Sequence, residues 1–427
     1  MLSRLGLTAA MLITAATSAW ALDLTVWVPA GYSPASGYVP GAEIHKQLYD
    51  KFEADNPDIT IKYEIIDGGP AGLQKLLTSA SSNTLPDVSI IDGQWIPRLV
   101  QSDVLQPLDK LWPESDRVDF HPAVLAAESV DGKPYGIMFQ TGMRGLLYRP
   151  SVMKSVGLSE FPRTFDEFLT AAKKLEEKGI TAELVPAKAT FEPSTMHMLS
   201  LFWGLGGELV DDTGKPVFFD GDNGTALASV YKWYHDMVAE GAMLPGVTTM
   251  DEAALRPFLY GGEVFAIGGS SSGVKQMWTD LPDLEKDLAV APYPMPEGKR
   301  PVTILGGFAY GLTAKDPAKV TAGWKFIEFM NSKENMGALN ERLGQLPVRN
   351  SIWTTNAFFS TDPLMASFKT MYDGDMKTRP AVPIYNTIST ALSEQLAGVI
   401  GGQVSPEAAV AAARDAVMPE YERQQNR

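Results

Sequence analysis

The chain of 427 residues contains no cysteine, which excludes a disulfide framework, a thiolate metal ligand and a cysteine nucleophile. Histidine is also scarce: the four histidines form no His-Glu-x-x-His motif. They are His45, His121, His197 and His235. No phosphate-binding loop is present either, because Gly214 and Lys215 are followed by Pro216 rather than serine or threonine. We therefore expect no metal ion and no organic cofactor.

Basic residues are outnumbered, with 36 Lys+Arg against 51 Asp+Glu and a formal net charge of −15. A surface this acidic repels phosphate backbones and anionic lipid head groups, so we expect no nucleic-acid and no membrane-surface binding. The charged and aromatic fractions, 20% and 10%, are those of an ordinary globular protein. At roughly 150 residues per domain, the length indicates two or three domains.

An enzymatic function has little support. Residues 269–273 match the Gly-x-Ser-x-Gly pattern of serine hydrolases, but no histidine follows Ser271, as that fold requires. A glycosidase needs only two carboxylates, and 51 acidic residues cannot exclude such a pair. We expect no catalytic residues, and a secreted carbohydrate-active hydrolase stays open as the alternative from a different class.

Long hydrophobic runs are absent, apart from a short one near the start. Arg4, the apolar run at 5–16 and the small-x-small site at 19–21 predict a cleaved signal peptide over residues 1–21. The run is too short to span a bilayer. Because no cysteine at the cleavage site can carry a lipid anchor, we expect an unanchored protein in the periplasm.

The remaining chain alternates strand and helix patterns. Apolar β-type runs at 24–28, 59–65 and 87–91 are separated by helical spacings at 44–52 and 73–80, which predicts a mostly parallel sheet covered by helices. Longer helices are predicted at 164–178, 194–203, 224–240 and 251–260, and further helices at 317–330, 333–343, 387–400 and 406–421. Short strands are predicted at 264–267 and 288–290, and a strand at 303–310 is expected to return to the first sheet.

Several segments together resemble the extracellular solute-binding proteins of ABC importers, in the maltose-binding-protein group. They are 24–28, 48–57, 85–92, 104–109, 131–137 with 147–148, 261–267, 305–307 and 322–329. The resemblance covers the mature chain and implies a periplasmic-binding-protein-like α/β fold, with two lobes and a ligand cleft between them. It implies an N-terminal lobe of 22–139 plus 301–345 and a C-terminal lobe of 140–300 plus 346–427.

The same resemblance implies a function. Members close on a solute by hinge bending and present it to a membrane permease of an ABC importer. Their ligands are carbohydrates, polyols and glycerol phosphates. We expect a monomeric protein that binds a small-molecule carbohydrate or polyol. A binder of glycerol phosphate or another anionic polyol is the alternative.

The candidate ligand-binding residues mostly follow strand ends, where ligands of doubly wound sheets bind, apart from Trp203 at a helix end and Tyr385 beside a proline-rich turn. They are Tyr32, Asp92, Gln94, Trp95, Gln140, Arg144, Trp203, Ser270, Ser271, Ser272, Gly307, Phe308 and Tyr385. Planar polar groups can bind sugar hydroxyls, and aromatic faces can stack on sugar rings. Asp92, Ser270–Ser272 and Gly307 match contacts of the family.

Each candidate also has a purely structural interpretation. Asp92 can cap a helix, Trp95 and Trp203 can be core residues, and the serines can cap a helix start. Arg144 can grip an anion together with the serines. Arg349 is expected in a solvated salt bridge. Arg379 and Tyr385 flank proline-rich turns, and Met196 and Met198 are expected to pack in the core.

Overall fold

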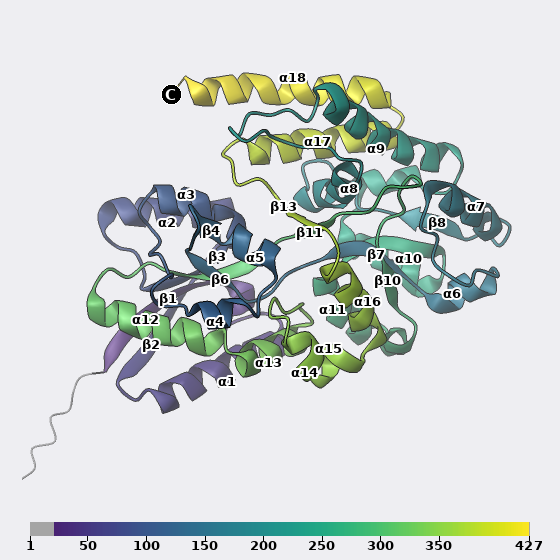
Figure 1. The fold of residues 1–427 in the computed structure, drawn as a ribbon. Coiled ribbons are helices and arrows are strands. Elements are labelled where there is room, and N and C mark those ends of the chain that lie inside the picture. Colours follow the sequence, from purple (N-terminus) through teal and green to yellow (C-terminus); the bar gives the residue numbers. More distant parts are fainter. Residues whose placement is uncertain (1–20, 427) are drawn as a thin grey trace, which may run out of the picture.

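Two β-sheets form the centres of two lobes in the computed structural model, which describes residues 21–426 (Figure 1). The signal peptide predicted over residues 1–21 lies outside these residues, apart from Ala21. Helices surround both sheets, and the C-terminal helix lies along the top of the molecule in this view (Figure 1). The α/β fold with two lobes is therefore present.

The first sheet has the strand order β2-β1-β3-β12-β6. Its strands are β1 (Leu22–Pro29), β2 (Ile59–Ile66), β3 (Val88–Asp92), β6 (Gly136–Met138) and β12 (Phe308–Leu312). β1 is parallel to β2 and β3, whereas β12 runs antiparallel to β3 and β6. The strand predicted at 303–310 is in fact two strands, of which only β12 returns to this sheet.

The second sheet has the order β10-β7-β9-β8. Its strands are β7 (Arg144–Tyr148), β8 (Thr181–Leu184), β9 (Val264–Ser270) and β10 (Ala289–Ala291). Only β8 and β9 are parallel. β7 brings the chain into this lobe and β10 leads it out again, so these neighbours run antiparallel. The expectation of a mostly parallel sheet thus fits three strands of the first sheet and not the second.

Helices cover both sheets. Those near the first sheet are α1 (Val39–Asp55), α2 (Pro70–Ser82), α3 (Ile96–Gln101), α4 (Glu114–Arg117), α5 (Pro122–Ala127), α12 (Pro317–Met330) and α13 (Lys333–Leu343). Those near the second are α6 (Pro150–Ser155), α7 (Phe165–Glu176), α8 (Glu192–Gly204), α9 (Gly221–Ala239), α10 (Glu252–Gly261), α11 (Val274–Asp280), α16 (Pro363–Tyr372), α17 (Tyr385–Ile400) and α18 (Pro406–Gln425). The short helices α14 (Ile352–Thr355) and α15 (Ala357–Thr361) precede α16.

Local sequence explains where several of these elements begin. α12 starts with Pro317 at its first position, and Asp316 accepts hydrogen bonds from the next two backbone N–H groups. α7 starts with a capping box formed by Thr164 and Glu167. Leu24, Val26 and Val28 alternate along β1 and are fully buried, so the sheet contributes one continuous face to the core.

Three chain segments cross between the lobes. The first joins β6 to β7, the second runs from β11 (Thr303–Leu305) into β12, and the third follows α13. They lie side by side: Gly142 N donates to Gly306 O over 3.0 Å, and Thr141 N donates to Leu346 O over 2.9 Å. In addition, the short strand β13 (Met376–Thr378) pairs in parallel with β11 of the second crossing segment. Hydrogen bonds therefore join the crossing segments into one crossing region between the lobes.

Candidate functional site

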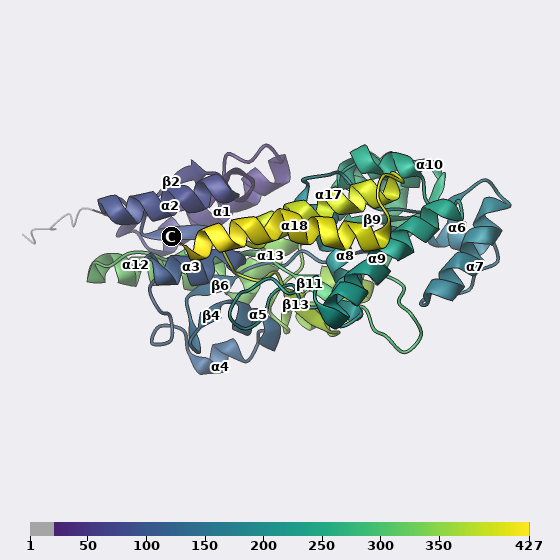
Figure 2. The same cartoon turned by 90° about the horizontal axis from the view of Figure 1, so that it is seen from above.

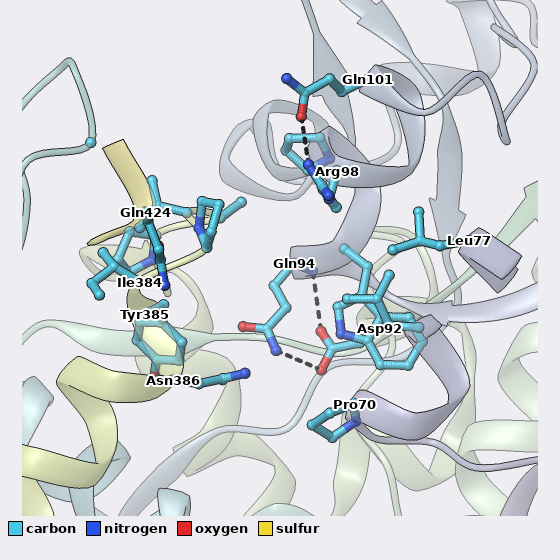
Figure 3. A pocket seen from close by; sticks show the side chains of 18 of the residues that line it. Pro70, Leu77, Asp92, Gln94, Arg98, Gln101, Ile384, Tyr385, Asn386 and Gln424 are labelled. Atoms are coloured by element: carbon cyan, nitrogen blue, oxygen red, sulfur yellow. Dashed lines mark hydrogen bonds between the residues drawn. The ribbon is translucent and has the colours of Figure 1, made fainter. Parts of the chain in front are cut away.

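A cavity of about 880 Å³ lies between the two lobes (Figure 3). One side is formed by residues 68–77 and 92–101, which belong to β3, α2 and α3 and the loops beside them. The opposite side is formed by Glu192 at the start of α8, the turn at 213–214 and the segment 380–386. The end of α18 contributes Tyr421, Gln424 and Gln425. The cavity therefore depends on segments that are far apart in sequence.

β3 delivers Asp92 to this cavity. Asp92 is the last residue of β3, at the carboxyl end of a parallel strand, where the chain turns into the short helical turn Gly93–Trp95. Its carboxylate caps that turn by accepting a hydrogen bond from Gln94 N over 3.1 Å. The side chains of Gln94 and Asp92 both line the cavity (Figure 3). Asp92 is thus a cap and a cavity residue at once, so its two interpretations are compatible.

Arg379 joins Asp92 to the opposite lobe. Its Nη2 donates to the two carboxylate oxygens of Asp92 over 3.1 and 3.2 Å, and its Nη1 donates to Glu192 Oε1 over 2.7 Å. Arg379 directly follows β13, and it is only 7% exposed. Burial acts to lower the pKa of Arg379, but the two carboxylates outweigh it and raise that pKa. Burial raises the pKa of Asp92, against the opposing effect of Arg379.

Two predicted aromatic residues line the cavity. Tyr385 is the first residue of α17, and Trp95 ends the turn after β3. Trp95 is 6% exposed, so most of its surface packs in the core and a small part faces the cavity. Core packing and cavity lining are therefore both properties of Trp95.

Four other candidates meet in the crossing region between the lobes rather than in the cavity lining. The Tyr32 hydroxyl accepts hydrogen bonds from Gln140 Nε2 over 3.1 Å and from Gln345 Nε2 over 3.0 Å. The Tyr32 ring lies 4.9 Å from that of Phe308, centre to centre. A Cβ on Gly307 would stand 2.0 Å from the carbonyl oxygen of Gln140, so only glycine permits this approach. Burial raises the pKa of Tyr32, which keeps its hydroxyl protonated.

The remaining polar candidates form a separate cluster in the second lobe. Arg144 Nε donates to Glu252 Oε1 over 3.1 Å, and Ser270 Oγ donates to Glu252 Oε2 over 3.1 Å. Ser270 and Ser272 share a hydrogen bond of 2.8 Å, and Ser271 Oγ accepts from Met143 N over 3.2 Å. The serines and Arg144 are therefore already partnered within the protein.

Glu252 is the centre of this cluster. His197 Nε2 lies 3.0 Å from Glu252 Oε1, and the other ring nitrogen of His197 bonds to the Tyr293 hydroxyl. Burial acts to raise the pKa of Glu252, but Arg144 and His197 outweigh it and hold that pKa well below its usual range. Burial lowers the pKa of His197, which favours the neutral ring. An anion at Ser270 and Arg144 would meet the charge of Glu252.

Other predicted residues lie away from the cavity. Trp203 is 5% exposed and packs in the hydrophobic core. Arg349 is buried rather than solvated, and it pairs with Asp116 over 2.8 Å and with Asp119 over 3.4 Å. Its guanidinium also donates from Nε to Asn331 O over 2.8 Å and lies 4.5 Å from the centre of the Phe120 ring, so protein groups surround it in place of water. Met196 and Met198 are core residues, as expected.

Several cavity residues have no counterpart among the sequence candidates. Besides loop residues at 68–69, 213–214 and 380–384, they are Glu192, Asn386, Tyr421, Gln424, Gln425 and the residues of α2 and α3 that face the cavity. Glu192 is the first residue of α8 and precedes a proline. This pattern marks the start of a helix in the sequence but does not mark a cavity residue. The other helical residues lie on amphipathic helices, where sequence spacing does not distinguish a cavity face from a solvent face.

Residues 21–426 contain no group of three or more histidine, aspartate or glutamate side chains arranged to hold a metal ion. Within the same part of the chain, no helix has the length and apolar character needed to cross a bilayer.

The fold and the cavity define a two-lobed α/β architecture with a binding cleft between the lobes. The chain belongs to the bacterial extracellular solute-binding protein family, whose pattern it matches over residues 35–337. A binding protein of Brucella abortus is 24% identical over 381 residues, covering 87% of this chain and 89% of the relative. The diacetylchitobiose binding protein DasA of Streptomyces coelicolor is 27% identical over 340 residues, with 77% and 74% covered.

Solved structures share the fold. The sugar-binding protein MalE of Xanthomonas citri superposes with a TM-score of 0.81 at 22% identity, covering 94% of this chain and 98% of that one. The cyclic α-maltosyl-1,6-maltose binding protein of Arthrobacter globiformis gives 0.77 at 22% identity, with 93% and 98% covered. Both neighbours are named for binding sugars. The resemblance stated from the sequence is therefore confirmed.

Proposed function

We propose that this chain captures a neutral carbohydrate or polyol in the cavity between its lobes and delivers it to the permease of an ABC importer. Its lobes comprise 22–139 with 301–345 and 140–300 with 346–427. It acts as a periplasmic monomer, released from its signal peptide, without a lipid anchor and without catalysis. The observation that carries the proposal is the cavity itself, which both lobes line and whose polar groups come from both sides.

The lining suits a polyhydroxylated ligand. Carboxylates at Asp92 and Glu192 accept hydrogen bonds, and amides such as Gln94 and Asn386 both donate and accept them. Trp95 and Tyr385 offer aromatic surface for the C–H faces of a sugar ring. The names of the relatives point the same way, since DasA is a diacetylchitobiose binding protein and the Xanthomonas protein binds sugar.

The charges favour a neutral ligand over an anionic polyol. At the cavity, Arg379 faces two carboxylates, Asp92 and Glu192, so this group of three carries a net negative charge. In the second lobe, the guanidinium of Arg144 is already paired with Glu252. Beside these two groups, a phosphate would therefore meet nearby carboxylates and a guanidinium that is already paired. Arg98 of α3 also lines the cavity and has no ion-pair partner among the described residues, so an anionic ligand would have to use that cation.

Release and capture are proposed to follow from hinge motion. The crossing segments meet at Gln140, Gly307 and Leu346, and bending there would change the angle between the two lobes. A ligand that contacts both lobes stabilises the closed form relative to the open form, and this shifts the population. The permease then recognises the closed form.

A thermal-shift panel tests the proposal. The chain from residue 22 onward is heated with mono- and oligosaccharides, polyols, and the phosphates of the same polyols. A ligand that binds only the folded state raises the free energy of unfolding by about 2.7 kcal/mol when its concentration is a hundredfold above its Kd. A neutral sugar that raises the melting temperature, is recovered intact and lowers the radius of gyration in X-ray scattering supports the proposal. Larger shifts from phosphates would reject the neutral ligand, and a consumed sugar would support the hydrolase.

A further inference from the structure

The cavity continues past the residues that hold Asp92 and ends against the last turns of α18. Six amide side chains line it: Gln74, Gln94, Gln101, Asn386, Gln424 and Gln425. Its volume, about 880 Å³, lies towards the upper end of the range of roughly 300–1,000 Å³ for small-molecule pockets. A single sugar ring beside Asp92 would leave the far part of this cavity unfilled.

α18 changes its environment along its length. Ala409, Ala413 and Val417 are buried at intervals of four residues, and this face packs against α17 and α9. The same spacing continues to Tyr421 and then to Gln424, which lies on the same face of the helix. These two residues are half-buried and line the cavity, and Tyr421 also packs against the hydrophobic core. The face that is apolar over the core thus becomes aromatic and polar over the cavity.

The position of this segment agrees with its composition. Figures 1 and 2 show from two directions that the C-terminal end of α18 reaches over the first lobe near α3. In Figure 3, Gln424 lies on the side of Ile384 and Tyr385, while Arg98 and Gln101 of α3 lie on the far side. Arg98 donates to Gln101 Oε1 over 3.1 Å, which leaves the amide nitrogen of Gln101 as a donor.

We propose that Tyr421, Gln424 and Gln425, together named the α18 rim, form with Gln101 a subsite for an outer ring of a bound oligosaccharide. This inference rests on the proposed function and specifies its ligand as a chain of at least two sugar units. Tyr421 supplies an aromatic face for stacking, and the amides bind hydroxyl groups in pairs. The rim comes from the second lobe and α3 from the first, so a longer ligand also adds contacts between the lobes.

Two double variants in the full mature chain test the subsite. Tyr421→Ala/Gln424→Ala removes the cavity side of the rim, and alanine preserves the helix. Glu422→Ala/Arg423→Ala is the matched control: it changes the same turn at exposed positions that do not line the cavity and keeps the net charge. Binding of glucose, maltose, maltotriose, mannose, mannotriose and diacetylchitobiose is measured by calorimetry, with N-acetylglucosamine as the monomer of the last.

In the unaltered chain, we expect an oligosaccharide to bind more tightly than its own monomer. In the rim variant, the ratio of oligosaccharide affinity to monomer affinity falls roughly tenfold, while the affinity for the monomer stays the same. The control variant keeps the ratio of the unaltered chain. If monomers and oligomers bind alike, or if the rim variant keeps the advantage, the inference is overturned and the proposed function still stands. If the unaltered chain binds none of these sugars, the proposed function itself loses its support.

Discussion

Arg379 and Asp92 form a buried ion pair, in which one guanidinium nitrogen lies 3.1 and 3.2 Å from the two carboxylate oxygens. The two residues are separated by 287 positions in sequence. Through its other terminal nitrogen, Arg379 also binds Glu192, so one side chain connects the end of β3 with the start of α8. This contact joins the two sides of the cavity in the present structure.

Arg379→Gln is expected to destabilise the protein by about 3–5 kcal/mol, because it leaves two carboxylates without their shared cation. Urea unfolding measures the change in the free energy of unfolding. Arg98→Gln is the control, since Arg98 is exposed and bonds only to Gln101 among the described residues. A loss below about 0.5 kcal/mol for Arg379→Gln, the scatter of ordinary surface changes, would contradict the importance of the pair.

Trp95→Ala is expected to lower both stability and ligand affinity, because Trp95 is a core residue that also faces the cavity. Removing a buried tryptophan costs about 3–5 kcal/mol. Trp203→Ala provides the matched comparison, since Trp203 is equally buried but lies outside the cavity lining. It should lose similar stability and keep its affinity. Equal affinities for both variants, measured by calorimetry at a temperature where both are folded, would show that Trp95 is only a core residue.

Glu183 makes stability depend on pH. It lies on β8, is fully buried, and neither carboxylate oxygen has a hydrogen-bond partner among the described residues. Burial raises the pKa of Glu183 to about 8. The folded chain therefore holds a proton that the unfolded chain releases near its ordinary pKa of about 4.3. Stability from this group is complete below the unfolded pKa and is lost as the pH rises through 8.

Glu183→Gln should remove this dependence. The variant keeps the shape of the side chain and carries no ionisable proton. We expect its free energy of unfolding to exceed that of the unaltered chain by a few kcal/mol above pH 8, and the two to converge towards pH 4.5. Urea unfolding at a series of pH values measures the difference. A constant difference across this range would contradict a raised pKa for Glu183.

Gly307→Ala is expected to disturb the crossing region, because the added Cβ would stand 2.0 Å from the carbonyl oxygen of Gln140. The two crossing segments must then separate, which should lower stability and change the radius of gyration. Gly142→Ala is the control in the neighbouring segment, where a Cβ meets nothing within 4 Å. If both variants behave alike in unfolding and in X-ray scattering, close contact at Gly307 is not required.

The sequence predicts most of the fold because its long elements have clear periodicity. The strands at 24–28 and 59–65 and the helices at 317–330 and 333–343 appear close to their expected positions. The sequence pattern predicts no helix over residues 351–372, although Asn356 and Asp362 cap α15 and α16. These helices are only five and ten residues long, too short to develop a strong helical period.

The site is predicted less completely. Asp92, Gln94, Trp95 and Tyr385 are candidates from the sequence that line the cavity. They can be predicted because strand ends and proline-rich turns are recognisable in a sequence. From the sequence, Arg379 is as readily an ordinary surface residue as a functional one, since its partners lie far away at positions 92 and 192. Which residues lie opposite one another across a cleft is decided by the tertiary fold, and a single sequence contains no direct information on such pairs.

The central claim is that one ligand is held from both lobes, and calorimetry on two single variants tests it most directly. Gln94→Ala removes an amide from the first lobe, and Asn386→Ala removes one from the second, with Gln403→Ala as an exposed control outside the cavity. With the sugar that gives the largest thermal shift, the account predicts that each cavity variant weakens binding roughly two- to tenfold and that the control does not. If only one of the two variants loses affinity, or neither does, capture between the lobes is contradicted.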